Sequence, residues 1–462
     1  MSADVYERLL RDGGAALAAR DPRLHDMLRR ELDRQESCLS LVASSSIADP
    51  AVLAAAASTA VNVTAEGYPG RRYHAGCTVL DEIEALACER ARRLFGASYV
   101  NVQPHSASTA NYTVLAMLMR PGDTMLGMAL DQGGHLTHGS PKAMAGQYFQ
   151  SIGYGLTGDG AIDYTQVRRL AREHRPRLIV CGATAYPRSI DFPLFRSIAD
   201  EVGAYLVADI SHTAGLVATG LHPSPIQHAH VTTTCTHKQL YGPRGGIIMS
   251  GADASGPAPR GRGTLADFLQ RAVFPFSQGA PAMNAIAAKA HALQLAMSPA
   301  FTARMRAVVS LAADLADALS HFGYRIVTGG TDNHIVLVDF GDSGPTGLAA
   351  ERALELCGII VNKNHVPGDT RPSLVTSGMR LGTNTIAARG MGAAQVRSCA
   401  ELVHRVIAQV SRTPGFPFTG PGGERFRDDV RREVRELCER FPLPGYPAAA
   451  RASVSTAGHD AA

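Results

Sequence analysis

The sequence of 462 residues is poor in lysine: only four of its 45 basic residues are lysines, at Lys142, Lys238, Lys289 and Lys363. Chemistry that requires a lysine amine therefore has few candidates. The sequence also has no run of about 18 or more apolar residues, which argues against a membrane span. Its first residues, MSADVYERLLRDGG, lack the basic and then apolar order of a secretory signal.

Neither the charge nor the cysteines point to a nucleic acid or a metal. The 45 basic and 41 acidic residues give a net charge of +4, which is too small and too dispersed for a nucleic-acid footprint. Eight cysteines are scattered without CxxC spacing, so we expect no structural zinc site and interpret them as reduced thiols of a cytoplasmic protein. A hydrophobic content of 45% with 19% charged residues is typical of a globular protein with a large core.

Short apolar runs alternate with stretches of helical periodicity between residues 95 and 255. The runs are YVNVQ (Tyr99–Gln103), TMLGMAL (Thr124–Leu130), RLIVCG (Arg177–Gly182), AYLVADI (Ala204–Ile210) and GGIIMSG (Gly245–Gly251). Strands separated by helices indicate an α/β fold with a mostly parallel sheet covered by helices on both faces. Ligands of such sheets bind outside the carboxyl ends of the strands.

Changes of pattern along the chain predict its organisation. Helical spacing precedes the alternating region, and a long helix after Pro299 leads into short strands and further helices of a smaller α+β unit. The last residues are rich in Ala, Ser and Gly without periodicity. We expect a helical arm over 1–50, a large α/β domain over 51–300, a small C-terminal α+β domain over 301–445 and a disordered tail over 446–462.

Three features together fit the needs of pyridoxal phosphate, namely a lysine for its aldehyde, a carboxylate for its ring nitrogen and a helix N-terminus for its phosphate. Lys238 follows a threonine-rich run, Asp209 ends an apolar run, and Ser106, Ala107 and Ser108 begin a helical stretch. Each has a plainer interpretation taken alone: a surface lysine, or helix-capping residues. His135, in GGHLTHGS, could stack on the cofactor ring, although a histidine in a glycine turn is more often structural.

Seven motifs, in order between Leu39 and Pro444, resemble the serine hydroxymethyltransferase family. They are EGYPGRRY (Glu66–Tyr73), NVQPHS (Asn101–Ser106), GGHLTHGSP (Gly133–Pro141), THKQLYGPRGG (Thr236–Gly246), GGTDNH (Gly329–His334), VNKNHVP (Val361–Pro367) and TSGMRLGT (Thr376–Thr383). The resemblance implies a fold-type I pyridoxal-phosphate transferase with a seven-stranded-type sheet. It also implies a homodimer with shared active sites, with a tetramer left open, acting on an amino acid and tetrahydrofolate.

The resemblance also implies a role for each matching residue. Lys238 would bind the cofactor covalently, Asp209 would pair with its ring nitrogen, His135 would stack on its ring, and Arg380 would bind the substrate carboxylate. Glu66 would handle protons as the one-carbon unit moves. The cofactor phosphate would be held by Ser106, Ala107, Ser108, His237, Ser277 and Gly279, and the cofactor ring oxygen by Thr184 and His212. The amino acid would also meet Ser44, Thr64, Tyr73 and His74, and the folate site would be lined by Tyr73, Leu130, Gly134, Leu136 and Asn364.

Departures from the family pattern leave the acceptor amino acid open. Two tyrosines are replaced by Thr64 and His74, ASEN reads Ala43–Ser46 (ASSS), and FPGGQGGP reads Phe274–Pro281 (FPFSQGAP). Lost aromatic volume could accommodate a substituent on the substrate Cα, as in interconversion of alanine and α-methylserine; serine–glycine interconversion with drifted neighbours is the alternative. A folate-independent threonine aldolase or transaldolase and an inactive regulatory subunit are also considered. The intact folate motifs and the presence of Lys238, Asp209 and Arg380 disfavour these two.

Overall fold

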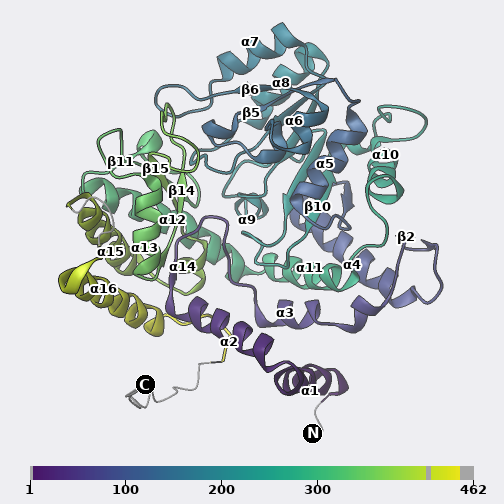
Figure 1. The fold of residues 1–462 in the computed structure, drawn as a ribbon. Helices are drawn as coiled ribbons and strands as arrows, with labels where there is room; N and C mark the ends of the chain where they lie inside the picture. Colours follow the sequence, from purple (N-terminus) through teal and green to yellow (C-terminus); the bar gives the residue numbers. More distant parts are fainter. Residues whose placement is uncertain (1–3, 413–417, 448–462) are drawn as a thin grey trace.

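The computed structural model describes residues 4–412 and 418–447 (Figure 1). A seven-stranded sheet with the strand order β4-β10-β9-β8-β7-β5-β6 forms its centre. Adjacent strands run parallel except around β10, which is antiparallel to both β4 and β9. The strands are β4 (Tyr99–Asn101), β5 (Thr124–Met128), β6 (Gln150–Tyr154), β7 (Leu178–Cys181), β8 (Tyr205–Asp209), β9 (Val231–Cys235) and β10 (Gly246–Ser250).

Helices pack against the sheet through apolar faces, and side-chain caps fix where several of them begin. Asp191 caps α8 by accepting a hydrogen bond from the Leu194 amide, and Gly203 ends that helix in the left-handed conformation. The helices of this unit are α3 (Pro50–Ala56), α4 (Thr78–Phe95), α5 (Ala107–Leu118), α6 (Met144–Tyr148), α7 (Tyr164–His174), α8 (Phe192–Val202), α9 (Ala214–Ala218), α10 (Leu265–Arg271) and α11 (Met283–Ala296).

The C-terminal part builds a second, smaller sheet beside the first (Figure 1). Its four strands lie in the order β11-β12-β15-β14, and all neighbours are antiparallel. The strands are β11 (Arg325–Ile326), β12 (Ile335–Asp339), β14 (Asn362–Asn364) and β15 (Gly378–Gly382), and the helices are α12 (Pro299–His321), α13 (Gly347–Leu356), α14 (Asn384–Ala388), α15 (Ala393–Arg412) and α16 (Gly420–Arg440).

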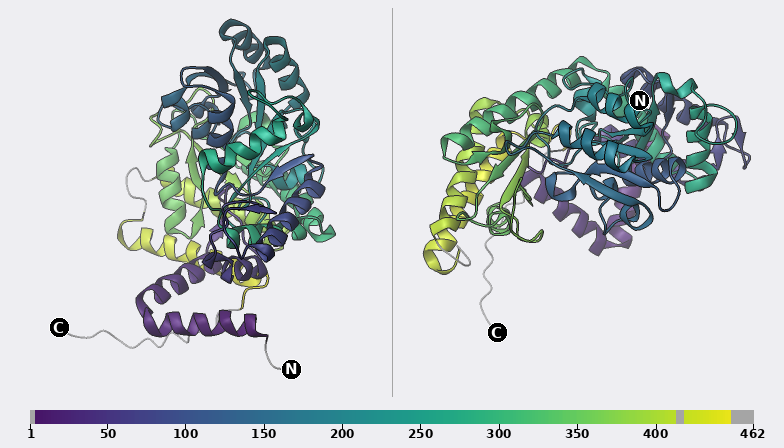
Figure 2. Two further views of the ribbon diagram at one scale, coloured as in Figure 1. Left: turned by 90° about the vertical axis from the view of Figure 1, so that its right-hand side faces the viewer. Right: turned by 90° about the horizontal axis from the view of Figure 1, so that it is seen from above.

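The N-terminal segment is tied to this C-terminal part. Strand β1 (Leu39–Ser40) pairs in parallel with β13 (Ile359–Ile360). Leu39 is paired with Ile359, which lies 320 positions later in the chain. Before it, α1 (Val5–Arg20) and α2 (Pro22–Ser37) extend below the body of the molecule (Figure 2). Several of their apolar side chains are exposed, among them Val5, Leu9 and Leu28.

The predicted fold class is confirmed, and each of the five predicted strands is present with slightly shorter bounds. Two strands of the large sheet, β6 and β9, were not predicted, although the threonine-rich run that forms β9 was noted. The division into domains stays a prediction. Residues 448–462 of the proposed tail lie outside the described residues. Tyr446, at the start of that proposed tail, is held by a hydrogen bond from its hydroxyl to the carbonyl of Ala48 at 2.9 Å.

All eight cysteines are unpaired thiols. In the part of the chain that the structure describes, none of the helices has both the length and the apolar character needed to cross a membrane.

Candidate active site

Three neighbouring strands bring the predicted catalytic residues to one edge of the large sheet. Thr184 follows β7, Asp209 ends β8, and Lys238 follows β9. These strands are parallel neighbours, so their carboxyl ends open at the same edge. The small sheet adds Arg380 from β15, whose guanidinium Nη1 donates a hydrogen bond to the carbonyl of Thr184 at 2.6 Å.

Asp209 is a buried carboxylate held by three donors. Its Oδ2 lies 2.8 Å from Nδ2 of Asn111 and 3.1 Å from Nε2 of His138, and its Oδ1 accepts a hydrogen bond from the amide of Ser211 at 2.9 Å. Burial alone would raise the pKa of this carboxyl, but the hydrogen bond and the charge of His138 hold it well below its usual range. Asp209 is therefore ionised, as a partner of a cationic ring nitrogen must be.

His135 lies beside Asp209 in a fixed orientation. Its Nδ1 is 2.8 Å from the hydroxyl of Thr137, which in turn accepts a hydrogen bond from Asn111. Burial lowers the pKa of His135 to about 4, so the imidazole is neutral near pH 7. A neutral, oriented ring is suited to stacking on a heterocycle.

Lys238 carries an amine without a hydrogen-bond partner among the described residues. Burial lowers its pKa, and the positive charges of Arg380 and Arg244 lower it further, whereas Cys235 and Asp209 act in the opposite direction. A larger fraction of the amine is therefore unprotonated than in a solvated lysine, and only the unprotonated amine attacks an aldehyde.

Arg380 is positioned to bind a carboxylate. Its Nε donates a hydrogen bond to Asn362 Oδ1 at 3.1 Å, and Nη1 is occupied by Thr184, whereas Nη2 has no partner in the described chain. Burial lowers the pKa of Arg380 to about 10, so the side chain keeps its charge near neutral pH. The neighbouring segment of Ser44 lies against this strand, because Gly382 donates its amide to the carbonyl of Leu41 at 2.7 Å.

The predicted phosphate-binding helix begins where expected. Ser106 caps α5, and its hydroxyl accepts a hydrogen bond from the amide of Thr109 at 3.0 Å. Gly246 of β10 leaves room for this turn, because a Cβ there would lie 2.3 Å from the carbonyl oxygen of Ser106. The plainer interpretation of Ser106 as a cap thus holds in this structure, while Ala107 and Ser108 form the first turn behind it.

Two histidines that follow β8 and β9 have buried ring nitrogens without a hydrogen-bond partner among the described residues. Nδ1 of His212 and Nδ1 of His237 are buried without a hydrogen-bond partner in the described chain. His212 also stacks on His334, with ring centroids 5.7 Å apart. Buried polar atoms normally find partners, so these nitrogens, with the free Lys238 amine, fit a polar group such as pyridoxal phosphate. Thr184 differs, since its hydroxyl donates to the carbonyl of Gly134 at 2.9 Å.

Of the predicted folate residues, only Leu130 lines the cavity of about 410 Å³ beside the large sheet. Leu130 lines it together with Met128, Ser140 and His365. Leu136, six positions after Leu130, is 47% exposed. The side-chain amide of Asn364 donates a hydrogen bond to the carbonyl of His365 at 2.7 Å. The turn that follows β5 requires glycine at position 134, because a Cβ there would lie 2.1 Å from the carbonyl oxygen of Met128.

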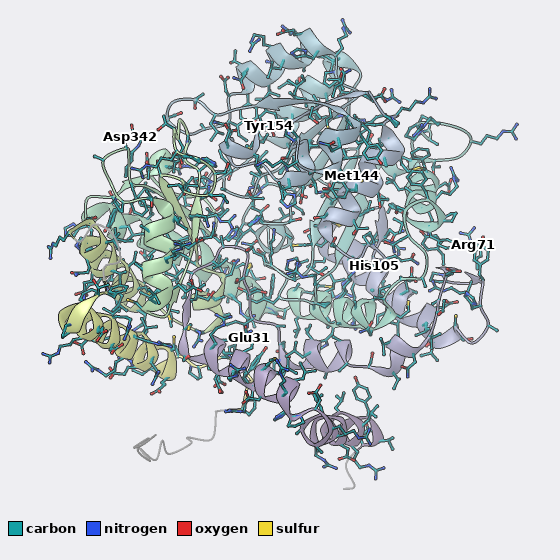
Figure 3. The ribbon with its side chains drawn as sticks, in the orientation of Figure 1. Glu31, Arg71, His105, Met144, Tyr154 and Asp342 are labelled. Atoms are coloured by element: carbon teal, nitrogen blue, oxygen red, sulfur yellow. The ribbon has the colours of Figure 1, made fainter. Side chains whose placement is uncertain are left out.

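A second group of predicted residues lies elsewhere, around the hairpin of β2 (Gly67–Tyr68) and β3 (Arg71–Arg72). Oε2 of Glu66 lies 3.4 Å from Nε2 of His74, and the ring of Tyr73 packs on Phe274 with centroids 5.5 Å apart. In Figure 3, Arg71 of this hairpin lies at the edge of the molecule and His105 nearer its middle.

The two groups are not joined within one chain. No hydrogen bond or ion pair links Glu66, Thr64, Tyr73 or His74 with Lys238, Asp209 or Arg380 among the described residues. The loop that carries Ser277 and Gly279 contacts both regions: Ser277 accepts a hydrogen bond from Thr113 of α5 at 2.7 Å, and a Cβ at Gly279 would lie 3.1 Å from Oε1 of Glu66.

Sequence reasoning missed two residues of the site, His138 and Asn111, which both bond to Oδ2 of Asp209. His138 stands within the quoted GGHLTHGSP motif, three positions after His135. Asn111 is a polar residue among the apolar positions of α5, which is the signal that could have identified it.

Comparison with known proteins agrees with this geometry. Residues 17–403 match the family model described as serine hydroxymethyltransferase. The chain is also 49% identical to a serine hydroxymethyltransferase of Rhodospirillum centenum, over 94% of this chain and 97% of the relative. It is 46% identical to such proteins of a Synechococcus strain (95% and 98% covered) and of Erythrobacter litoralis (96% and 98%). The chain belongs to the serine hydroxymethyltransferase family.

Membership in the serine hydroxymethyltransferase family confirms the predicted enzyme class, a pyridoxal-phosphate-dependent transferase. Enzymes of this family bind pyridoxal phosphate covalently at a lysine and use tetrahydrofolate as co-substrate. The family also supports hydroxymethyl transfer between serine and glycine with tetrahydrofolate, but it does not distinguish the α-methylserine variant. The roles assigned to single residues stay predictions.

Proposed function

We propose that this protein moves a one-carbon unit between tetrahydrofolate and an amino acid, with Lys238 as the residue that holds pyridoxal phosphate. The observation that carries the proposal is the convergence of Lys238, Asp209 and Arg380 at the carboxyl edge of the sheet. When bound, the cofactor supplies an electron sink for breaking a bond at the substrate Cα. The experiment is to follow methylene-tetrahydrofolate formed from serine and tetrahydrofolate by the purified protein.

Each side chain has a task that follows from its surroundings. Asp209 would keep the ring nitrogen protonated, since its own charge is held by His138 and Asn111. Arg380 would bind the substrate carboxylate through Nη2, the nitrogen without a partner in the described chain. Such a contact fixes the orientation of the amino acid, because the guanidinium itself is held at Nε and Nη1.

The separation of the two residue groups supports a site shared between two subunits. Glu66, Tyr73 and His74 lie on a hairpin at the edge of the molecule, and Tyr73 is 74% exposed. The apolar side chains of Val61 and Phe276 are also exposed, at 65% and 56%. We propose that this surface packs on a second copy of the chain and that Glu66 completes the partner's site.

Mixed dimers test the shared site. Glu66→Gln and Lys238→Ala subunits should each be inactive alone, but a dimer of one of each has one site with both native residues. Random mixing makes about half of the dimers mixed, so we expect about a quarter of wild-type activity after co-expression. The measurement is hydroxymethyl transfer by the co-purified mixture. No recovery above the separate variants would place Glu66 in the same subunit's site as Lys238.

The replaced tyrosines favour alanine as a second acceptor besides glycine. Thr64 and His74 stand where the family pattern has tyrosines, and Nε2 of His74 lies 3.4 Å from Oε2 of Glu66. Removal of an aromatic ring leaves a space that costs stability unless something fills it. A methyl group on the substrate Cα is an occupant of suitable size, and the product would then be α-methylserine.

A competition assay tests the acceptor. With tetrahydrofolate and formaldehyde, we expect the protein to consume one enantiomer of alanine as well as glycine. Thr64→Tyr should lower kcat/KM for alanine by about 10–100-fold and change that for glycine much less, because the ring would occupy the place of the methyl group. Exclusive use of glycine by the wild type would exclude α-methylserine synthesis. Aldol products from threonine and an aldehyde without folate would instead favour a transaldolase.

A further inference from the structure

Lys289 is a fully buried lysine for which the proposed reaction has no task. It lies on α11 and is 2% exposed. Its Nζ donates hydrogen bonds to the carbonyl oxygens of Val102 at 2.6 Å, Pro104 at 3.0 Å and Gly246 at 3.0 Å. An ammonium has three N–H donors and a neutral amine has two, so this set of three acceptors matches the charged form.

Within the part of the chain that the structure describes, no carboxylate pairs with this charge. Glu84 is near enough to raise the pKa of Lys289, but its own oxygens are bonded to Arg72 and to Nε2 of Gln103. Burial acts in the opposite direction and lowers the pKa of Lys289 to about 7. A buried charge without an ionic partner is costly, and an apolar residue of similar size would avoid that cost.

Two of the three carbonyls belong to the segment that leads into the predicted phosphate-binding turn, and the third, of Gly246, belongs to β10. Val102 and Pro104 lie between β4 and α5, and the Pro104 carbonyl shares its peptide group with the amide of His105. Gly246 also donates its amide to the Pro104 carbonyl at 2.9 Å. A cation on the carbonyl side of a peptide group polarises it and strengthens its N–H as a donor. Lys289 therefore joins the turn to β10 and adds positive charge behind the N-terminus of α5.

Two glycines, Gly245 and Gly246, leave space for the side chain of Lys289 and for the turn that it contacts. A Cβ at Gly245 would lie 2.2 Å from Cε of Lys289, and a Cβ at Gly246 would lie 2.3 Å from the Ser106 carbonyl oxygen. The branched guanidinium of arginine, the more common cation in this chain, would need more space at the same place. The scarcity of lysine and the buried position together indicate a specific requirement for an ammonium group.

We propose that Lys289 is a positioning residue that orders the turn from Val102 to Ser106 and supplies a buried positive charge for the phosphate of the cofactor. This inference rests on the proposed function, because it takes that turn to be the phosphate site. It predicts that Lys289 contributes to affinity for the phosphate group and not to the covalent bond at Lys238.

The test compares pyridoxal phosphate with pyridoxal, which has the same aldehyde and no phosphate. Apoprotein is titrated with each compound by absorbance, for the wild type, Lys289→Met, Lys289→Gln and the control Arg432→Met, which removes an exposed cation of α16. We expect Kd for pyridoxal phosphate to rise by at least about tenfold in both Lys289 variants and Kd for pyridoxal to change by less than about twofold. The control should keep both wild-type values.

Other outcomes separate the possible failures. Equal weakening of both compounds, or an unchanged preference for the phosphate, would overturn the role of Lys289 while leaving the proposed function intact. If both variants failed to fold even at saturating pyridoxal phosphate, the proposed role in phosphate binding would also be overturned. Lys289 would then be required only for the stability of the core. A wild-type protein that binds neither compound would instead contradict the proposed function itself.

Discussion

A Lys238→Ala variant is expected to lose hydroxymethyl transfer by at least about 10³-fold. Among the described residues, Lys289 is held by three carbonyls and Lys363 is paired with Glu351 at 2.7 Å, so neither offers a substitute amine. The absorbance that lysine-bound pyridoxal phosphate gives to the wild type should disappear as well. Steady-state kinetics and an absorption spectrum of the purified variant measure both effects.

The control for this prediction is Arg432→Ala, which removes an exposed cation of α16 and should leave spectrum and rate unchanged. Thermal unfolding without cofactor provides a second control. Because Lys238 makes no hydrogen bond through its amine in the described chain, its truncation should not lower the stability of the apoprotein. A near-normal rate in Lys238→Ala would show that another group binds the cofactor.

An Asp209→Asn variant is expected to keep the cofactor bound and to lose about 10²–10³-fold in kcat. The amide has the shape of the carboxylate but no charge to keep the ring nitrogen protonated. In the native protein that charge is secured by His138 at 3.1 Å and Asn111 at 2.8 Å. Single-turnover kinetics with saturating serine would separate this loss of rate from weaker binding.

Asp200→Asn is a matched control, because its carboxylate is 58% exposed and belongs to a surface ion pair with Arg196. Its effect on kcat should be negligible. If Asp209→Asn retained more than about half of the wild-type kcat, the charge at position 209 would not matter to the reaction, and the role assigned to Asp209 would be wrong.

The large sheet could be predicted from the sequence where apolar β-formers stand together, as in the strands ending at Cys181 and Asp209. It could not be predicted where a buried strand is polar. Strand β9 contains three fully buried threonines, and a hydrophobic pattern does not distinguish these from a solvated loop. The pairing of β1 with β13 joins segments that are far apart in the chain, so no local signal reports it.

The site shows the same limit at the level of side chains. Lys238, Asp209 and Arg380 could be identified from motifs, and they do converge. The bonds that set their chemistry, such as Nη1 of Arg380 to the Thr184 carbonyl, depend on how two sheets approach each other. Lys289 was visible only as one of four lysines, because burial of a charged residue cannot be inferred from its neighbours in sequence.

The most direct test of the account is to find where pyridoxal phosphate is attached. Reduction of the wild-type holoprotein with borohydride makes the bond between aldehyde and lysine permanent, and digestion with mass spectrometry then identifies the labelled peptide. We predict one cofactor per chain, on the peptide that contains Lys238. A label on Lys142, Lys289 or Lys363, or no label after addition of pyridoxal phosphate, would contradict it.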